Sequence, residues 1–292
     1  MKSFLSMPED RRITHLALGK FDGMHLAHKE LFKHLGESGA VLCIESSGEL
    51  LTPNKELYCD KEMIFVEFSD IAEWNGAYFV KKLKEKFRAL EKLVVGYDFC
   101  FGKNRAWNAV DLADLFGGEV IIVPEFCVKG QGVHSSVIKQ AIKQGDMKNA
   151  RALLGRYYHI QGKVVKGQNL GSTQLYATIN IETSGYVLPQ NGVYASFTKL
   201  QNRIYKSVCF VGHRLSTDGA FSIETHIIDK DFMAEDRAGA DSKIDTQTDF
   251  KNMLVSIYFV EKIRDNKVFK RLDELKVCIT QDILRAYEIL ES

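Results

Sequence analysis

Residues 13–35 read ITHLALGKFDGMHLAHKELFKHL, and this stretch decides the fold of the first half of the chain. Residues 13–18 form a short apolar run that predicts a buried strand. Residues 19–23 are bounded by glycines and predict a turn, and residues 25–35 carry apolar side chains at helical spacing. A buried strand that leads through a tight turn into a helix is typical of one βα unit of a parallel sheet.

The same alternation of strands and helices continues to about residue 155. Short apolar runs predict further strands at 40–44, 93–95 and 120–123, and amphipathic patterns predict helices at 78–90 and 110–116. Residues 135–154 predict a helical hairpin or a bent helix, with a turn at Gly145 and with Asp146 as a helix N-cap. We therefore expect an α/β domain that binds ligands at the carboxyl ends of its strands.

The pattern changes near Gly155. From there the apolar residues alternate with polar ones in short segments, at 194–197, 208–211, 223–227 and 255–259. This period of two, with glycine and Asn/Asp turns between segments, predicts an antiparallel barrel or sandwich. Apolar residues from Leu272 to Leu290 recur at helical spacing and predict a closing helix. We predict two domains, residues 1–155 and 156–292.

Composition excludes several classes of protein. The chain has 292 residues, of which 45% are hydrophobic and 26% charged, which are ordinary globular values. Lys+Arg 39 against Asp+Glu 38 leaves no basic excess for nucleic-acid binding. No segment has the roughly 18 consecutive apolar residues of a membrane span, and residues 1–10 do not resemble a secretory signal. The six scattered cysteines favour reduced thiols and a cytoplasmic location.

The turn at 19–23 is followed by two histidines, His25 and His28, which the spacing places on one face of the predicted helix start. Free backbone N–H groups and the helix dipole favour anions there, and imidazoles could donate hydrogen bonds to phosphate. The alternative is that both are surface histidines without a chemical role.

Two motifs in this half resemble a known family. Residues 18–28, LGKFDGMHLAH, are similar to the G-x-F-D-G-x-H-x-G-H of bacterial bifunctional riboflavin kinase/FAD synthetases, a form of the H-x-G-H signature of nucleotidylyltransferases. Residues 94–103, VVGYDFCFGK, resemble that family's V-V-G-x-D-F-x-F-G-K. The resemblance implies a Rossmann-like nucleotidyltransferase fold in which His25 and His28 stabilise phosphate charge. It implies ATP binding at Gly19, Phe21, Asp22 and Gly23, and flavin binding at Asp98 and Phe99.

A third motif and several departures accompany this resemblance. Residues 132–139, GVHSSVIK, resemble a degraded I-S-S-T-x-I-R, which implies phosphate contacts from Ser136 and Lys139. Lys139 replaces an arginine and loses its bidentate fork. Ala27 replaces a glycine between the two histidines, and residues 45–49 stand where the family carries F-x-P-H-P. The adenylyltransferase half is thus recognisable but eroded.

The second half resembles the riboflavin kinase domain of the same family, which implies a β-barrel with a terminal helix. Residues 155–171 are similar to its entry, and the resemblance assigns Gly162, Gly167 and Gly171 to ATP phosphates; the alternative is ordinary hairpin turns. Residues 177–180, ATIN, resemble P-T-A-N and imply that Thr178 and Asn180 hold magnesium, with Asn180 also at the phosphates. Residues 172–176 are an insertion relative to that motif.

The remaining kinase motifs follow in the family's order. Residues 188–195, LPQNGVYA, match L-P-x-x-G-V-Y-A, and residues 222–229, SIETHIID, contain its V-E-x-H-x-x-D strand, which makes Glu224 the implied catalytic base. Without that context Glu224 would be a solvated or ion-paired strand residue. Arg264 is implied in flavin or phosphate binding, against the alternative of a surface arginine paired with a neighbour. Residues 230–249 replace a D-L-Y-G element and predict a loop or lid.

The resemblance implies a bifunctional enzyme that uses ATP and Mg²⁺, phosphorylates riboflavin to FMN and adenylylates FMN to FAD. We expect small-molecule ligands only, no nucleic-acid or membrane partner, and no prediction of oligomeric state follows. The principal alternative is a riboflavin kinase whose adenylyltransferase domain has degenerated. A different nucleotidylyltransferase would leave the second half unexplained, and a non-enzymatic flavin-binding protein would leave Glu224 unexplained.

Overall fold

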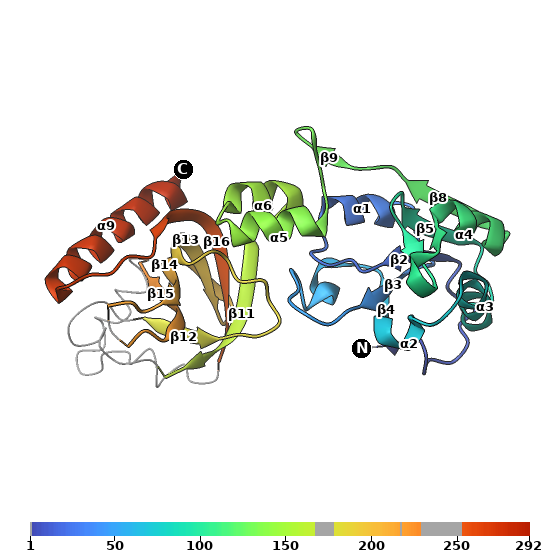
Figure 1. Ribbon diagram of the computed structural model, residues 1–292, viewed down its shortest axis with the longest axis horizontal. Helices are drawn as coiled ribbons and strands as arrows, with labels where there is room; N and C mark the ends of the chain where they lie inside the picture. The colour runs from blue at the N-terminus through green and yellow to red at the C-terminus, as the bar shows by residue number, and fades with distance from the viewer. Residues whose placement is uncertain (1, 167–177, 217, 229–252) are drawn as a thin grey trace. The chain divides into compact units, whose positions relative to one another are not determined.

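The computed structural model describes residues 2–166, 178–216, 218–228 and 253–292. The chain divides into two compact units, Met1–Ser135 and Ser136–Ser292. Each unit has its own arrangement of strands, a sheet in the first and a barrel in the second (Figure 1). The predicted segment 230–249 and the insertion 172–176 lie outside the described residues.

The first unit is built on a six-stranded parallel sheet in the order β1-β4-β3-β2-β5-β8. Its strands are β1 (Lys2–Ser3), β2 (His15–Gly19), β3 (Gly39–Glu45), β4 (Glu62–Glu67), β5 (Lys92–Gly96) and β8 (Glu119–Val123). Its helices are α1 (Leu26–Phe32), α2 (Phe68–Ile71), α3 (Gly76–Lys86) and α4 (Ala109–Phe116). Shorter elements are η1 (Lys55–Tyr58), β6 (Cys100–Phe101), η2 (Lys103–Arg105), β7 (Trp107–Asn108), β9 (Cys127–Val128) and β10 (Gln131–Gly132).

Successive residues of these strands pack into two separate cores. Leu16 and Leu18 of β2 contact the cluster that contains residues of α3 and α4, whereas Ala17 between them contacts the cluster that contains Leu31 of α1. Because side chains alternate across a strand, burial of both sets means that both faces of the sheet are covered. This explains why the strands read as continuous apolar runs.

The second unit begins with a helical hairpin and continues as a closed barrel. The hairpin consists of α5 (Ser135–Lys143) and α6 (Met147–Leu154). Ser135, the first residue of α5, is the last residue of the first unit. The barrel order is β11-β12-β15-β14-β13-β16. Its strands are β11 (Tyr158–Val165), β12 (Ile179–Glu182), β13 (Gly192–Leu200), β14 (Arg203–His213), β15 (Phe221–Ile227) and β16 (Leu254–Asp265). All neighbouring pairs are antiparallel.

Hydroxyl groups form a hydrogen-bonded chain inside the barrel. Thr198 Oγ1 lies 2.7 Å from Thr225 Oγ1 and 2.8 Å from Ser207 Oγ, and Ser207 Oγ lies 2.8 Å from Ser196 Oγ. All four side chains are fully buried. Buried polar groups are tolerated when they are paired in this way. The chain therefore joins β13, β14 and β15 at one level of the barrel interior.

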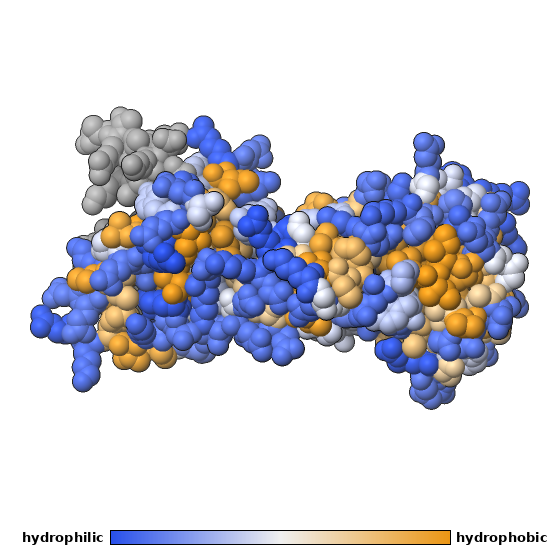
Figure 2. Space-filling view, turned by 90° about the horizontal axis from the view of Figure 1, so that it is seen from above, coloured by the Kyte–Doolittle hydropathy of each residue, from blue (hydrophilic) through white to orange (hydrophobic). Residues whose placement is uncertain are grey.

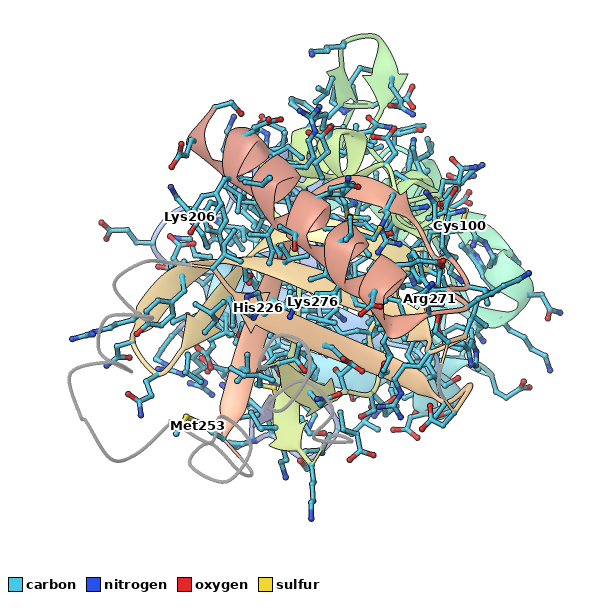
Figure 3. The ribbon with its side chains drawn as sticks, turned by 90° about the vertical axis from the view of Figure 1, so that its left-hand side faces the viewer. Cys100, Lys206, His226, Met253, Arg271 and Lys276 are labelled. Atoms are coloured by element: carbon cyan, nitrogen blue, oxygen red, sulfur yellow. The ribbon has the colours of Figure 1, made fainter. Side chains whose placement is uncertain are left out.

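The terminal helix α9 (Leu272–Glu291) crosses the outside of the barrel (Figure 3). Ala286 of α9 is fully buried in a cluster with Val193 and Val208 of the barrel. Asp282 of α9 accepts hydrogen bonds from Arg264 Nε and Nη2 at 2.9 and 2.8 Å, and both side chains are largely buried. This ion pair ties the helix to β16.

The structure confirms the predicted fold classes, the helical hairpin and the N-cap at Asp146, which accepts a hydrogen bond from the Asn149 N–H. β4 was not predicted, because its apolar run is only four residues long and is flanked directly by glutamates. The compact units meet at Ser135–Ser136, since α6 packs on β11 and β16. The sequence boundary at residue 155 stays a prediction.

On the face shown in Figure 2 the surface is mainly hydrophilic, with apolar side chains gathered in separate patches on each unit. Patches of this kind are ordinary on globular proteins and do not define a site by themselves. Among the residues that the structure describes, no helix is both long and apolar enough to cross a membrane.

We predict that Asp282→Ala lowers the free energy of unfolding of the second unit by about 3–5 kcal/mol, because it leaves the Arg264 charge buried without its partner. The measurement is urea denaturation followed by circular dichroism. Glu288→Ala is the matched control on the same helix. It removes an exposed pair with Arg285 and should cost less than about 1 kcal/mol. Equal effects of the two variants would contradict the structural role of the ion pair between Arg264 and Asp282.

The stability of the second unit should also depend on pH through His159. Burial, with the nearby charges of Arg156 and Lys199, lowers the pKa of His159 to about 4. The unfolded chain therefore takes up this proton first as pH falls from about 6.5, and unfolding becomes easier by up to about 3 kcal/mol by pH 4. Denaturation midpoints between pH 7 and 4 should fall less in His159→Gln than in the parent. The exposed His34→Gln should follow the parent curve, and identical slopes for all three proteins would disprove the assignment.

Candidate active sites

The order of the first sheet brings two sequence motifs to one edge. β2 lies between β3 and β5, and the chain passes from β2 to β3 and β4 on one side before returning to β5 on the other. The carboxyl ends of β2 and β5 therefore flank the topological switch point, where α/β sheets bind ligands. The turn after β2 carries the predicted phosphate residues, and the loop after β5 carries Asp98 and Phe99.

The turn after β2 is unusually strained. Phe21, Gly23 and Met24 all have positive φ angles of 50°, 89° and 44°, and both Phe21 and Met24 are buried. Such a conformation costs energy at residues other than glycine and persists only where the surroundings enforce it. The Phe21 ring packs over Gly19, where an added Cβ would lie 3.0 Å from Phe21 Cζ. Phe21 and Gly19 thus shape the turn together.

Asp22 ties this turn to other parts of the first unit. Its Oδ1 accepts hydrogen bonds from the Leu51 and Thr52 N–H groups at 2.7 and 3.3 Å. Its carbonyl oxygen accepts one from the Ser135 hydroxyl at 2.7 Å. Asp22 is itself buried. These contacts give Asp22 a structural function beside the ligand contact that the sequence implies.

His25 and His28 lie together at the start of α1, as predicted. His25 is the N-cap residue of the helix, and its ring stacks on that of His28 with centroids 3.5 Å apart. The Phe21 ring contacts His28 edge-on at 5.2 Å. His25 is buried, and His28 is partly exposed. The pair therefore has one defined arrangement at the switch point, suited to stabilising negative charge.

Tyr97, in the loop after β5, joins a hydrogen-bonded group with Glu125 and His134, which follow β8, and the sequence did not reveal this group. His134 Nε2 lies 3.0 Å from Glu125 Oε1 and 3.4 Å from the Tyr97 hydroxyl. The hydrogen bond from His134 holds the pKa of the Glu125 carboxyl below its usual range, and partial desolvation raises the pKa of Tyr97. Next to Tyr97, Phe99 stacks on Phe101 with centroids 5.6 Å apart. Asp98 and Phe99 thus stand in a loop with defined side-chain packing.

A buried ion pair was also missed, at the end of β3. Lys55 is fully buried and its Nζ lies 2.6 Å from Glu45 Oε1 and 3.4 Å from Cys43 Sγ. Burial alone would lower the pKa of Lys55, but the adjacent Cys43 and Glu45 outweigh it and raise that pKa. Burial raises the pKa of Cys43 to about 12, so its thiol is not reactive. The pair occupies the segment where the related family carries F-x-P-H-P.

Ser136 and Lys139 lie on α5, in the second compact unit. Their predicted phosphate contacts stay predictions. The neighbouring Ser135 contacts the turn after β2 through the Asp22 carbonyl.

In the second unit, strand register brings two predicted residues together. Asn180 of β12 pairs with Glu224 of β15, while the adjacent pair of Ile179 and Thr225 is buried in the barrel interior. Asn180 and Glu224 therefore lie on the outer face of the sheet. Thr178, which directly precedes β12, falls on the same face as Asn180 by the period of two.

This pairing belongs to a row that crosses five strands on the outer face. Strand by strand, the row consists of Asn180, Glu224, Phe210, Val193 and Arg264. Neighbouring strands lie about 4.8 Å apart, so the Arg264 backbone is about 14 Å from that of Glu224. His226, two residues beyond Glu224, is labelled in Figure 3 on the barrel face that α9 crosses.

A pocket of about 460 Å³ opens beside Asn180. Its walls include Lys166, Ser222 and Arg214. Arg214 was not predicted as a site residue, and its Nη1 lies 3.5 Å from Glu224 Oε1. The pocket thus combines two basic side chains with the polar residues of β12 and β15.

The other predicted residues of this unit have mixed outcomes. Gly162 lies inside β11, where an added Cβ would lie 2.5 Å from the Glu182 carbonyl oxygen, so packing alone already requires glycine. Gly167 and Gly171 lie outside the described residues. Arg264 forms its ion pair with Asp282, and its Nη1 donates a hydrogen bond to the Asp265 carbonyl at 3.0 Å. Its guanidinium lies 5.8 Å from the centroid of the Phe269 ring. The ligand roles of these residues stay predictions.

Comparison with known families matches both halves of the chain. A riboflavin kinase family model matches residues 154–290, and an FAD synthetase family model matches residues 56–153. The strained turn and His25–His28 precede the second of these ranges.

Similar proteins cover almost the whole chain. Proteins named bifunctional riboflavin kinase/FMN adenylyltransferase from Haemophilus influenzae and Escherichia coli are each 28% identical to it. The alignments cover 95% and 94% of this chain, and 94% and 91% of those proteins. A crystal structure described as a macrolide-efflux protein from Streptococcus pneumoniae is 25% identical, with a TM-score of 0.80 over 97% of this chain and 96% of that one.

We predict that Asp22→Ala loosens the turn after β2, because it leaves the buried N–H groups of Leu51 and Thr52 without their acceptor. The expected cost is about 1–3 kcal/mol. Hydrogen–deuterium exchange should show faster exchange in a peptide that spans residues 51 and 52. Asp60→Ala, at an exposed aspartate, is the control and should leave this peptide unchanged. Unchanged exchange in Asp22→Ala would contradict the role of the carboxylate.

Proposed function

The chain belongs to the bifunctional riboflavin kinase/FMN adenylyltransferase family, and on this premise we propose that it makes two flavin cofactors in succession. The second unit phosphorylates riboflavin with ATP to give FMN. The first unit, with the turn after β2, transfers AMP from a second ATP to FMN, which gives FAD and releases pyrophosphate. The substrates are small molecules throughout.

The observation that carries the kinase assignment is the pairing of Asn180 with Glu224 beside the 460 Å³ pocket. Both residues lie in the range matched by the riboflavin kinase family model. Phosphoryl transfer requires a positioned nucleophile and neutralised phosphate charge more than it requires a strong base. Glu224 would accept the proton of the ribityl 5′-hydroxyl, and Lys166 on the pocket wall supplies positive charge.

Magnesium is the metal that this site suits. Thr178 and Asn180 offer two neutral oxygen ligands on one face, and the described residues contain no cluster of three His, Cys, Asp or Glu side chains that could form a protein cage. Magnesium commonly binds through few protein ligands together with waters and substrate phosphates. When bound, it would neutralise phosphate charge during the transfer. The described residues thus suit a magnesium ion that binds together with ATP better than a metal held by protein ligands alone.

For adenylyl transfer we propose that His25 and His28 donate hydrogen bonds to the ATP phosphates at the switch point. Gly19, Phe21, Asp22 and Gly23 would form the turn that receives those phosphates. Support comes from the strained backbone of this turn, which other contacts of the first unit hold in place.

The remaining residues complete this proposal. Asp98 and Phe99 would contact the flavin from the loop after β5, and Ser136 and Lys139 would contact the ATP phosphates. In the kinase half, Gly162, Gly167 and Gly171 would lie near the ATP phosphates, and Arg264 near the flavin or its phosphate.

We also propose a cytoplasmic location. All six cysteines are free thiols, which fits a reducing compartment.

The test is incubation of the purified protein with riboflavin, ATP and magnesium, followed by chromatographic separation of FMN and FAD. Both products should accumulate, FMN first. FMN without FAD would instead favour a kinase whose adenylyltransferase half is inactive. The absence of both products would contradict both proposed catalytic activities.

Substitution of one residue in each half should separate the two reactions. Glu224→Gln should slow FMN formation by about 10²–10⁴-fold and leave FAD formation from supplied FMN within about twofold. His28→Asn should slow FAD formation from supplied FMN by about 10²-fold and leave FMN formation nearly unchanged. Each variant serves as the control for the other, and equal loss of both reactions in either variant would contradict the assignment.

A further inference from the structure

We propose that Arg214 is a positioning residue of the riboflavin kinase half, which holds the Glu224 carboxylate in its reactive orientation beside the pocket. This inference rests on the proposed function, in which Glu224 is the base. It assigns a role to a side chain that no sequence motif singled out.

The contact itself is direct. Arg214 Nη1 lies 3.5 Å from Glu224 Oε1, and each side chain is 20% exposed. An arginine in this position restricts the rotation of the carboxylate that it faces. Glu224 would otherwise have several rotamers open to it on the outer face of β15.

The guanidinium is fixed from its other side. Asp218 accepts hydrogen bonds from Arg214 Nε at 3.0 Å and from Nη2 at 2.8 Å. This fork-to-fork arrangement sets the plane of the guanidinium and leaves Nη1 directed to Glu224. The order of contacts is therefore Asp218 to Arg214 to Glu224.

Backbone hydrogen bonds hold both ends of this arrangement. The Arg214 N–H donates to the Ala220 carbonyl at 2.9 Å, and the Gly219 N–H donates to the Arg214 carbonyl at 3.1 Å. The Ala220 N–H also donates to Asp218 Oδ1 at 3.1 Å. Arg214 and Asp218 thus belong to one closed turn between β14 and β15.

The strand faces leave a path from Arg214 to Glu224. Register pairs Phe210 with Glu224 and Gly212 with Ser222, so Arg214 falls on the same outer face two residues beyond Gly212. Only glycine and serine lie between the two charged residues on this face. A long side chain from Arg214 can therefore reach diagonally across β15 to Glu224.

Correct orientation of the base matters for this reaction because small errors in geometry reduce the rate of a positioned proton transfer. A positioning role predicts a loss in kcat with little change in substrate binding. Direct binding of phosphate by Arg214 predicts instead a higher KM for ATP.

The experiment is a double-mutant cycle on the full chain, with FMN formation as the readout. Arg214→Ala should lower kcat about tenfold or more and change KM for riboflavin and for ATP by less than about threefold. In the Glu224→Gln background the same substitution should cause no further loss, because its effect acts through the carboxylate. FAD formation from supplied FMN should be unchanged, which controls for the first unit, and an unchanged urea denaturation midpoint of the second unit reports that the half carrying Arg214 is folded.

Two further variants distinguish a positioning role of Arg214 from a general disruption of the turn between β14 and β15. Asp218→Asn keeps the shape of its side chain, weakens the hold on the guanidinium and should give a smaller loss in kcat. Arg214→Lys restores the charge without the fork and should recover part of the activity. Arg285→Ala, at an exposed arginine on α9, is the matched control and should not differ from the parent.

The outcomes separate the two claims. Losses that multiply in the double variant, a rise in KM for ATP alone, or full kcat in Arg214→Ala would each overturn the positioning role and leave Glu224 as the base. An unchanged kcat in Glu224→Gln would overturn the proposed base, and the inference with it.

Discussion

The register between β12 and β15 is the constraint on which the proposed kinase site depends. Side chains alternate faces along a strand, so a slip of β12 by one residue would turn Asn180 into the barrel, away from Glu224, and bring Ile179 out. Thr225 is held inside by its hydrogen bond to Thr198, and barrel closure through β11 and β16 leaves no free edge along which the sheet could slip. The interior packing of the barrel therefore determines the geometry of the polar residues on its outside.

A different constraint acts in the first unit, where the order of parallel strands brings the loops of the proposed site together. β2 and β5 are separated by more than 70 residues of sequence but pair directly, with Ala17 opposite Val94. Their carboxyl ends must then lie side by side, whatever the loops contain. The loops can vary while the strands keep them in place. This explains why the turn after β2 can hold a strained backbone: Asp22 anchors it to Leu51, Thr52 and Ser135, outside the strand from which it leaves.

Sequence patterns predicted what depends on local periodicity and missed what depends on contacts between distant residues. The βα units, the barrel strands and the closing helix each repeat a period that is visible within one segment. The stacking of His25 on His28 could also be expected, because i and i+3 residues face the same way. By contrast, Arg214 contacts Glu224 only because of a hairpin register, and Lys55 reaches Glu45 only because η1 packs against the end of β3. Nothing in the neighbourhood of Lys55 in the sequence distinguishes it from a surface lysine.

Several departures from the family pattern lie in the first half of the chain, and at one of them the structure shows a buried ion pair. Where the family carries F-x-P-H-P, this chain has Glu45 paired with the buried Lys55. Removing two charges from water is costly unless the geometry of the pair is good. The 2.6 Å pair of Lys55 and Glu45 therefore differs from a weak ion pair on the surface. The ion pair also reaches the turn after β2, because Cys43 Sγ, 3.4 Å from Lys55 Nζ, donates a hydrogen bond to the Lys20 carbonyl at 3.1 Å. An eroded motif here does not imply an unstructured site. This edge of the sheet is held by the pair of Lys55 and Glu45 and by the hydrogen bonds of Asp22, and the strained turn lies beside it.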